Sequence, residues 1–253
     1  MDPLSRFRLD DRVVLITGAS SGLGAGFARA VAAVGATVVL AARREDRLVA
    51  LAEELRAQGS SVLTHATDVS SVDDCRALAA AAAAEFGRID VLVNNAGLGG
   101  STPALREDPD RFRAVVDVNL NGTFWMAQAC AAVMNEGASI VNIASVHGLV
   151  ASRFPQAAYA ASKAGVLGLT RDLAQQWSRR KGIRVNALCP GYFASEMTAE
   201  GESALREMVA DQSVLGRFGT QEELDSALLF LASDASSYMT GASLVVDGGM
   251  SAV

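Results

Sequence analysis

The stretch RVVLITGASSGLG, residues 12–24, joins a run of aliphatic residues to a glycine-rich turn and the start of a helical pattern. Glycines at positions 18, 22 and 24 let the backbone turn tightly and let a pyrophosphate approach main-chain N–H groups at the positive end of the next helix. The position between a first strand and a first helix favours a dinucleotide site over a plain tight turn. No Gly-Lys-Ser/Thr follows, which excludes the usual P-loop.

Beyond this turn, apolar runs alternate with longer helical patterns. Continuous apolar runs, unlike alternating ones, are typical of strands buried on both faces of a parallel sheet. We therefore predict an α/β protein, a single-domain Rossmann fold over residues 1–253, with a doubly wound seven-stranded parallel sheet and helices on both faces. The seven predicted strands are RVVLITG, TVVLAA, SVLTHAT, DVLVNNAG, SIVNIAS, RVNALCP and SLVVDGG.

Five helices are expected between these strands. Asp108 followed by Pro109 is typical of an N-cap and first helical residue, and Gly182 follows a basic cluster that suits a helix C-terminus. Residues 191–219 interrupt the strand–helix rhythm with polar, helix-like sequence, and we expect this excursion to cover a ligand site. The expected helices span residues 23–34, 45–58, 73–86, 108–134 and 156–180.

Composition excludes several classes of function. The chain has 22 basic and 28 acidic residues, a net charge of −6, and one short basic run, which disfavours a nucleic-acid partner. Cys75, Cys130 and Cys189 are odd in number and widely spaced, as expected of buried thiols in a reducing cytosol rather than disulfides. No secretory signal or membrane span is visible, and no His/Asp/Glu cluster has metal-ligand spacing. We expect a cytoplasmic protein without a membrane partner or a metal.

Six ordered motifs carry a family resemblance. They are TGxxxGxG at residues 17–24, NNAG at 94–97, Asn119, Ser145, Tyr159-x3-Lys163 and Pro190-Gly191. With these motifs the sequence resembles the short-chain dehydrogenase/reductase family over essentially its whole length. The resemblance implies an NAD(P)-dependent enzyme that interconverts a secondary alcohol and a ketone.

The residues that decide between NAD and NADP are expected where the second strand ends, because the adenosine ribose lies there. Ala42 stands where NAD-binding members often carry Asp, and a guanidinium pairs well with a phosphate. We therefore predict NADP(H), with Arg43 as the main contact and Arg44 as a weaker one; NAD(H) stays an alternative. The resemblance places Asp68 and Val69 at the adenine. The remaining cofactor contacts that it implies are Gly18, Ser20, Ser21, Gly22, Leu23, Gly24, Asn95, Ala96, Gly97, Tyr159, Lys163, Pro190, Gly191 and Ser195, the last in place of the usual threonine.

The chemistry depends on a tyrosine, whose free phenol, with a pKa of about 10, is a poor base at neutral pH. Lys163 lies one turn from Tyr159 on the same helix face, and its charge, with that of oxidised nicotinamide, favours the phenolate. By resemblance, Tyr159 is the acid/base catalyst and Ser145 holds the substrate oxygen. The resemblance also implies that Asn119 positions a water that is linked to Lys163. We expect His147, Phe154, Tyr192 and Met197 to form the substrate wall with Ser145 and Tyr159.

Several alternatives stay open at this point. The substrate could be an oxoacyl thioester, a small ketone, a sugar or a steroid-like alcohol. A nucleotide-binding regulator without catalysis would show a damaged tetrad, whereas Asn119, Ser145, Tyr159 and Lys163 are all present. A methyltransferase is disfavoured by the Tyr159–Lys163 pair. The resemblance also implies a homotetramer, with long helices and the C-terminal strand at interfaces.

Overall fold

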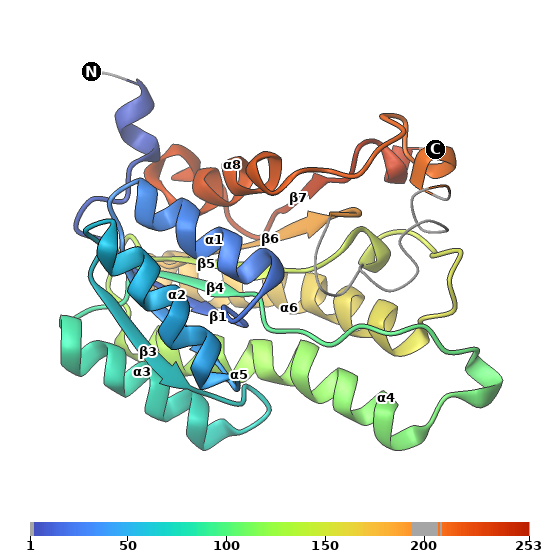
Figure 1. Ribbon diagram of the computed structural model, residues 1–253, viewed down its shortest axis with the longest axis horizontal. Helices are drawn as coiled ribbons and strands as arrows, with labels where there is room; N and C mark the ends of the chain where they lie inside the picture. The colour runs from blue at the N-terminus through green and yellow to red at the C-terminus, as the bar shows by residue number, and fades with distance from the viewer. Residues whose placement is uncertain (1–2, 194–206, 208, 253) are drawn as a thin grey trace.

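The seven predicted strands form one parallel sheet in the computed structural model, which describes residues 3–193, 207 and 209–252 (Figure 1). Their order is β3-β2-β1-β4-β5-β6-β7, so the chain winds outward from β1 in one direction and from β4 in the other. The predicted doubly wound Rossmann fold is confirmed. The strands are β1 (Val13–Thr17), β2 (Thr37–Ala42), β3 (Val62–Ala66), β4 (Val91–Asn94), β5 (Ser139–Ile143), β6 (Arg184–Pro190) and β7 (Ser243–Val246).

Helices cover both faces of this sheet (Figure 1). They are α1 (Gly22–Ala33), α2 (Glu45–Ala57), α3 (Val72–Phe86), α4 (Pro109–Val116), α5 (Gly122–Val133), α6 (Ala157–Lys181) and α8 (Gln221–Ala232). Because side chains alternate along a strand, Val14 and Ile16 of β1 join the core under α1, α2 and α8, whereas Val13 and Leu15 join the core under α3, α5 and α6. Short 3-10 turns are η1 (Pro3–Phe7), η2 (Ala104–Arg106), η4 (Val146–Gly148), η6 (Asp234–Ser236) and η7 (Met250–Ala252).

The predicted helix ends at Asp108 and Gly182 are confirmed. The Asp108 side chain accepts a hydrogen bond from the Asp110 N–H at 2.8 Å, which caps α4 behind Pro109. At the end of α6, Gly182 has φ +67°, the left-handed conformation that glycine adopts without steric penalty. The start of α4 and the end of α6 are therefore defined by local sequence.

The single helix predicted over residues 108–134 is divided into α4 and α5 by a π-helical turn, η3 (Asp117–Asn121). Such a turn adds one residue to the helical repeat and is frequent at functional sites. It contains Asn119, whose side chain is fully buried and bonds outside its own helix. Tertiary hydrogen bonding therefore overrides the helical pattern of this segment.

The excursion at residues 191–219 is described only in part. Phe193 forms a parallel bridge with Gly219, and the Gly219 N–H donates to the Tyr192 carbonyl at 3.0 Å, so the two ends of the segment meet. Residues 194–206 and 208 lie outside the described ranges. The predictions made for Ser195 and Met197 therefore stay predictions.

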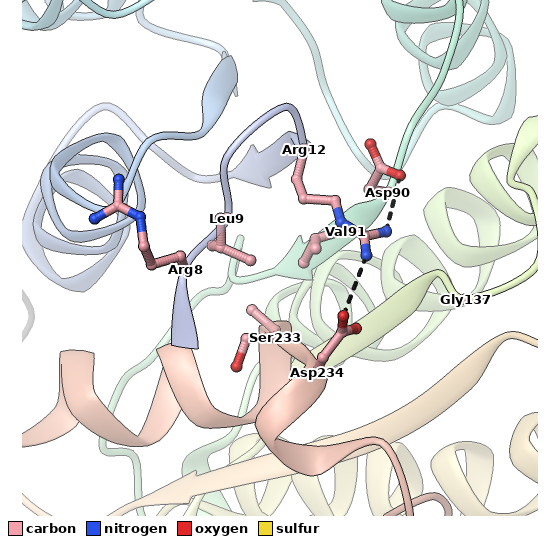
Figure 2. A pocket seen from close by; sticks show the side chains of 9 residues that line it. Arg8, Leu9, Arg12, Asp90, Val91, Gly137, Ser233 and Asp234 are labelled. Carbon is pink, nitrogen blue, oxygen red and sulfur yellow. Dashed lines mark hydrogen bonds and ion pairs between the residues drawn. The ribbon is translucent and has the colours of Figure 1, made fainter. Parts of the chain in front are cut away.

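An ion cluster lies at the edge of the sheet where the strands begin. Figure 2 shows Arg12 reaching between Asp90, just before β4, and Asp234 in η6, with nitrogen–oxygen distances of 3.4 and 3.5 Å. Asp90 is buried and also accepts hydrogen bonds from the Val13 N–H and from Arg88 Nε, both at 2.9 Å. The buried carboxylate thus ties the start of β1 to the start of β4.

Replacing Asp90 by Asn is expected to lower the free energy of unfolding by about 2 kcal/mol, because two arginines lose a charge-assisted acceptor. Both arginines are partly exposed, so solvent screens part of the loss. Thermal unfolding at fixed protein concentration should show a decrease of roughly 4–8 °C in Tm. The matched control is Asp234→Asn, whose exposed carboxylate bonds the same Arg12; an equal decrease in both variants would contradict the assignment.

Candidate active site

A cleft of about 900 Å³ opens where the strands end, at the opposite edge of the sheet from the Asp90 cluster. The loops that follow β1, β4, β5 and β6 line it. Strand order reverses between β1 and β4, and open α/β sheets bind ligands outside the carboxyl ends of their strands at that switch point. The cleft therefore lies where the fold places a ligand.

The glycine-rich turn forms one end of the cleft. Gly18 has φ +66°, and a Cβ there would lie 2.8 Å from the Ala96 Cα, so no larger residue fits. Asn95 Nδ2 donates to the carbonyls of Thr17 at 2.9 Å and Gly18 at 3.2 Å, while Thr17 Oγ1 accepts from the N–H groups of Asn95 and Ala96. The turn and the loop after β4 are therefore locked together beneath the N-terminus of α1.

Two arginines follow β2 beside this turn. Arg44 donates from Nη2 to the Ser21 hydroxyl at 2.7 Å and to the Ser20 hydroxyl at 3.1 Å. Arg43 is exposed, and both arginines line the cleft next to Ala42. A guanidinium and two serine hydroxyls therefore surround one corner of the cleft, where they can donate to an anionic group.

Asp68 and Val69 line the same half of the cleft, after β3. The Asp68 carboxylate accepts from the N–H and the hydroxyl of Ser70 at 3.0 and 2.7 Å, which fixes this turn. Val69 is buried against Gly122, at the start of α5, where a Cβ would lie 2.8 Å from the valine side chain. Close packing of α5 on this turn therefore holds the predicted adenine contacts in place.

Ser145, Tyr159 and Lys163 meet at the other end of the cleft. Ser145 follows β5, and its hydroxyl accepts from the His147 N–H at 3.1 Å. Lys163 is buried, donates from Nζ to the Ile143 carbonyl at 2.7 Å, and lies 5.7 Å from the centre of the Tyr159 ring. The turn after β5 and one face of α6 thus bring the three predicted catalytic side chains together.

Burial shifts the ionisation of this pair in opposite directions. Desolvation raises the pKa of Tyr159, and a hydrogen bond with Ser145 acts against that rise. Desolvation lowers the pKa of Lys163 to about 8. The expected decrease in the Tyr159 pKa is therefore not found for the chain alone, because the cost of burying a phenolate outweighs the bond from Ser145.

Asn119 lies behind the cleft wall rather than on it. Its Nδ2 donates to the Leu98 carbonyl and to the Ser162 hydroxyl, both at 3.0 Å, and its Oδ1 accepts from the Leu98 N–H at 2.7 Å. The Ser162 hydroxyl in turn donates to the Tyr159 carbonyl at 2.7 Å. Asn119 therefore connects the loop after β4 to the catalytic face of α6.

An aromatic wall faces Ser145. The Tyr192 hydroxyl lies 3.1 Å from His147 Nε2, and the two rings meet edge to face, with centroids 5.6 Å apart. Tyr192 also stacks on Phe218 at 6.2 Å. Burial lowers the pKa of His147, so the imidazole is neutral at pH 7. His147, Phe154 and Tyr192 all line the cleft, at the positions where the sequence predicts a substrate wall.

Every predicted cofactor contact within the described residues lines the cleft. Ser195 and Met197 are outside the described ranges, and Asn119 is the one catalytic candidate that does not line it. The nucleotide-side residues brought together are Gly18, Ser20, Ser21, Gly22, Leu23, Gly24, Arg43, Arg44, Asp68, Val69, Asn95, Ala96, Gly97, Pro190 and Gly191.

Comparison with known proteins identifies the family. Residues 18–251 match the family model described as enoyl-(acyl carrier protein) reductase. Galactitol 2-dehydrogenase (L-tagatose-forming) of Cereibacter sphaeroides is 44% identical over 257 residues, covering 98% of each chain. The crystal structure of a short-chain type dehydrogenase/reductase from Mycobacterium marinum is 35% identical, has a TM-score of 0.94 and covers 98% of this chain and 99% of its own. The chain belongs to the short-chain dehydrogenase/reductase family.

A third relative adds information on the ligand class. A gluconate 5-dehydrogenase from Burkholderia cenocepacia, solved in complex with NADP and tartrate, is 38% identical, has a TM-score of 0.93 and covers 99% of each chain. As a short-chain dehydrogenase/reductase, this chain is an oxidoreductase that interconverts CH–OH and C=O groups with a nicotinamide dinucleotide. The predicted enzyme class is confirmed.

Some residues of this short-chain dehydrogenase/reductase cleft are not singled out by the sequence. The loop at residues 98–101, Gln156 and Phe193 all line it. Gln156 stands three residues before Tyr159, and that i, i+3 spacing is the one signal that could have found it. The loop carries no motif; it is held by the bonds of Asn119 to Leu98 and, just beyond it, by the bond from the Thr102 N–H to the Pro155 carbonyl at 2.8 Å.

Within residues 3–193, 207 and 209–252, no group of three or more His, Cys, Asp or Glu side chains could hold a metal ion. The three cysteines of this short-chain dehydrogenase/reductase are buried and unpaired, and burial raises the pKa of the Cys75 and Cys189 thiols to about 11. None of the helices in the described part of the chain is long and apolar enough to cross a bilayer.

Proposed function

We propose that the protein is an NADP(H)-dependent enzyme that reduces ketones to secondary alcohols and catalyses the reverse oxidation. Tyr159 is the general acid in reduction and the general base in oxidation. The observation that carries this proposal is the meeting of Ser145, Tyr159 and Lys163 at one end of a dinucleotide-sized cleft. The nicotinamide, when bound, supplies or accepts the hydride. In reduction the carbonyl carbon gains the hydride and its oxygen gains the Tyr159 proton, so charge and atoms balance.

The residues of the cleft fit a nicotinamide dinucleotide. Backbone can approach a pyrophosphate closely at Gly18, where a Cβ would clash with Ala96, and the N-terminus of α1 favours negative charge. Ser145 is proposed to donate its hydroxyl to the substrate oxygen, so that developing negative charge is shared with Tyr159. Lys163 supplies the positive charge that favours the Tyr159 phenolate in alcohol oxidation.

Asn119 is proposed to hold a water that links Lys163 to solvent. The point that a Cβ at Gly97 would occupy lies 3.4 Å from Asn119 Oδ1 and 3.6 Å from Lys163 Nζ. Gly97 places no side chain between the two polar groups, and we propose that a water bridges them. Both Asn119 Nδ2 protons are already donated, to Leu98 and Ser162, so Oδ1 is the atom that would accept from the water.

NADP(H) preference is proposed from the corner formed by Ser20, Arg43 and Arg44. Strand β2 ends in Ala42 rather than in an acidic residue, and Arg44 is already held by two serine hydroxyls, so little further ordering is needed to meet a phosphate. The NADP in the related gluconate 5-dehydrogenase supports the same preference. The second candidate is an NAD(H)-dependent enzyme with the same catalytic residues.

Replacing Arg43 or Arg44 by Ala is expected to lower kcat/KM for NADPH by about 30-fold, because a charge-assisted contact to the 2′-phosphate is lost. The kcat/KM for NADH, which has no such phosphate, should stay within threefold. The assay is reduction of a ketone panel with each cofactor in turn. Arg47→Ala, one turn along α2, is the matched control for charge. Wild-type preference for NADH, or equal losses with both cofactors, would contradict NADP(H) preference.

The proposed substrate is a secondary alcohol that carries at least one further hydroxyl group, or the corresponding ketone. The name of the relative galactitol 2-dehydrogenase supports this class. The proposed assembly is a homotetramer, as the family resemblance implies. Edge strand β7 and helix α4 each expose a large apolar side chain, Val245 and Phe112, which supports contacts between copies there.

A further inference from the structure

Gln156 is held at the mouth of the cleft by backbone contacts on two sides. It stands immediately before α6, where its carbonyl accepts from the Ala160 N–H at 2.9 Å. It also forms a parallel bridge with Thr102, in the loop after β4, beside the bond from the Thr102 N–H to the Pro155 carbonyl. These contacts therefore fix the backbone position of Gln156.

The Gln156 carboxamide has unused donors beside the catalytic residues. Its Nε2 is buried and has no hydrogen-bond partner among the described residues, although the side chain lines the cleft. Gln156 stands three residues before Tyr159, and both residues line the cleft. A buried amide without a partner costs about 1–3 kcal/mol, and a ligand oxygen in the cleft would remove that penalty.

The aromatic wall formed by His147 and Tyr192 carries a second polar group in the same cleft. The Tyr192 hydroxyl pairs with His147 Nε2 at 3.1 Å, and His147 is buried. The described residues that line this end of the cleft include no cation besides Lys163, whose Nζ is bonded to Ile143. Neutral donors and acceptors without a counter-ion suit a hydroxyl better than a carboxylate.

We propose that Gln156 is a specificity-determining residue whose carboxamide binds a hydroxyl on the carbon next to the reacting carbonyl, so that the preferred substrates are α-hydroxy ketones and vicinal diols. This inference rests on the proposed function. A site built to bond a hydroxyl rejects the analogue that lacks it, because the buried amide then stays unpaired. The wild-type enzyme therefore prefers the hydroxylated member of a matched pair of ketones by about 100-fold in kcat/KM.

The experiment compares 3-hydroxybutan-2-one with butan-2-one and 2-hydroxycyclohexanone with cyclohexanone, each reduced with NADPH. Gln156→Met keeps the length of the side chain but removes its donors. It is expected to lower kcat/KM for the hydroxy ketones about tenfold, mainly through KM, and to leave the plain ketones within threefold. Gln156→Asn keeps the donors and should retain part of the preference. Gln176→Met, on the exposed side of α6, is the matched control.

Several outcomes would overturn the inference. Gln156 does not recognise the hydroxyl if the wild type has the higher kcat/KM for the plain ketones. The same conclusion follows if Gln156→Met lowers kcat/KM equally for hydroxy and plain ketones while NADPH binding and Tm are unchanged. A wild type that binds NADPH but reduces no ketone of either pair, and oxidises no corresponding alcohol, contradicts the proposed function and this inference with it. Failure of the inference alone leaves ketone reduction by the wild type intact, which distinguishes the two.

Discussion

Replacement of Tyr159 by Phe is expected to lower kcat/KM for ketone reduction by about 10³-fold. Phenylalanine keeps the ring that packs in the cleft and removes only the hydroxyl, so the substrate oxygen loses its proton donor. Burial raises the pKa of Tyr159, which keeps the phenol protonated at pH 7 and suits it to donate a proton in this direction. Steady-state reduction of a ketone panel measures the loss, and fluorescence titration with NADPH should show binding within threefold of wild type.

The matched control for this change is Tyr238→Phe. Tyr238 is fully exposed, so removing its hydroxyl should leave both the rate and the Tm unchanged. A Tyr159→Phe variant with full activity would contradict proton transfer by Tyr159. Weak NADPH binding together with a lower Tm would instead show that the hydroxyl supports the structure of the cleft.

Much of the fold could be predicted because local sequence and tertiary structure agree there. The strands are continuous aliphatic runs that only a sheet covered on both faces can bury. The start of α4 and the end of α6 follow from Asp108 and Gly182, whose local conformations decide them. Where several local preferences point to the same structure, the sequence alone is informative.

The π-helical turn at Asp117–Asn121 could not be predicted, because its cause lies elsewhere in the chain. Asn119 bonds to both main-chain groups of Leu98 and to the Ser162 hydroxyl. Close approach of Gly122 to Val69 also fixes the start of α5. These contacts join residues far apart in sequence, so they cannot be inferred from the helical pattern of residues 108–134.

The candidate site was predicted unevenly for a similar reason. Side chains that carry family motifs, such as Ser145 and Tyr159, line the cleft, and their catalytic roles stay predictions. Gln156 carries no motif, and its buried amide without a partner is visible only in the folded structure, where the residue bridges Thr102 of the loop after β4. The direction of the Tyr159 pKa was also hidden, because desolvation depends on the depth of burial rather than on a neighbour in sequence.

Replacement of Lys163 by Met is expected to lower kcat/KM for alcohol oxidation at pH 7 by about 10²-fold. Oxidation needs the Tyr159 phenolate as base, and the Lys163 ammonium, 5.7 Å from the ring centre, favours that anion. Because an opposite charge shifts a pKa by about 1–3 units, the variant should need a pH at least one unit higher for the same oxidation rate. Ketone reduction uses the protonated phenol and should lose less.

The dependence on pH separates this role from a structural one. The pKa of Lys163 is lowered to about 8 by burial, so the wild-type ammonium is present below that pH and lost above it. The difference between wild type and variant in oxidation should therefore be largest below pH 8 and decrease as the pH rises further. The control is Lys181→Met, since Lys181 also lies on α6 and donates to a carbonyl, that of Ala131, at 2.7 Å. Equal losses in oxidation and reduction at every pH from 6 to 10 would show that Lys163 acts only through its bond to Ile143.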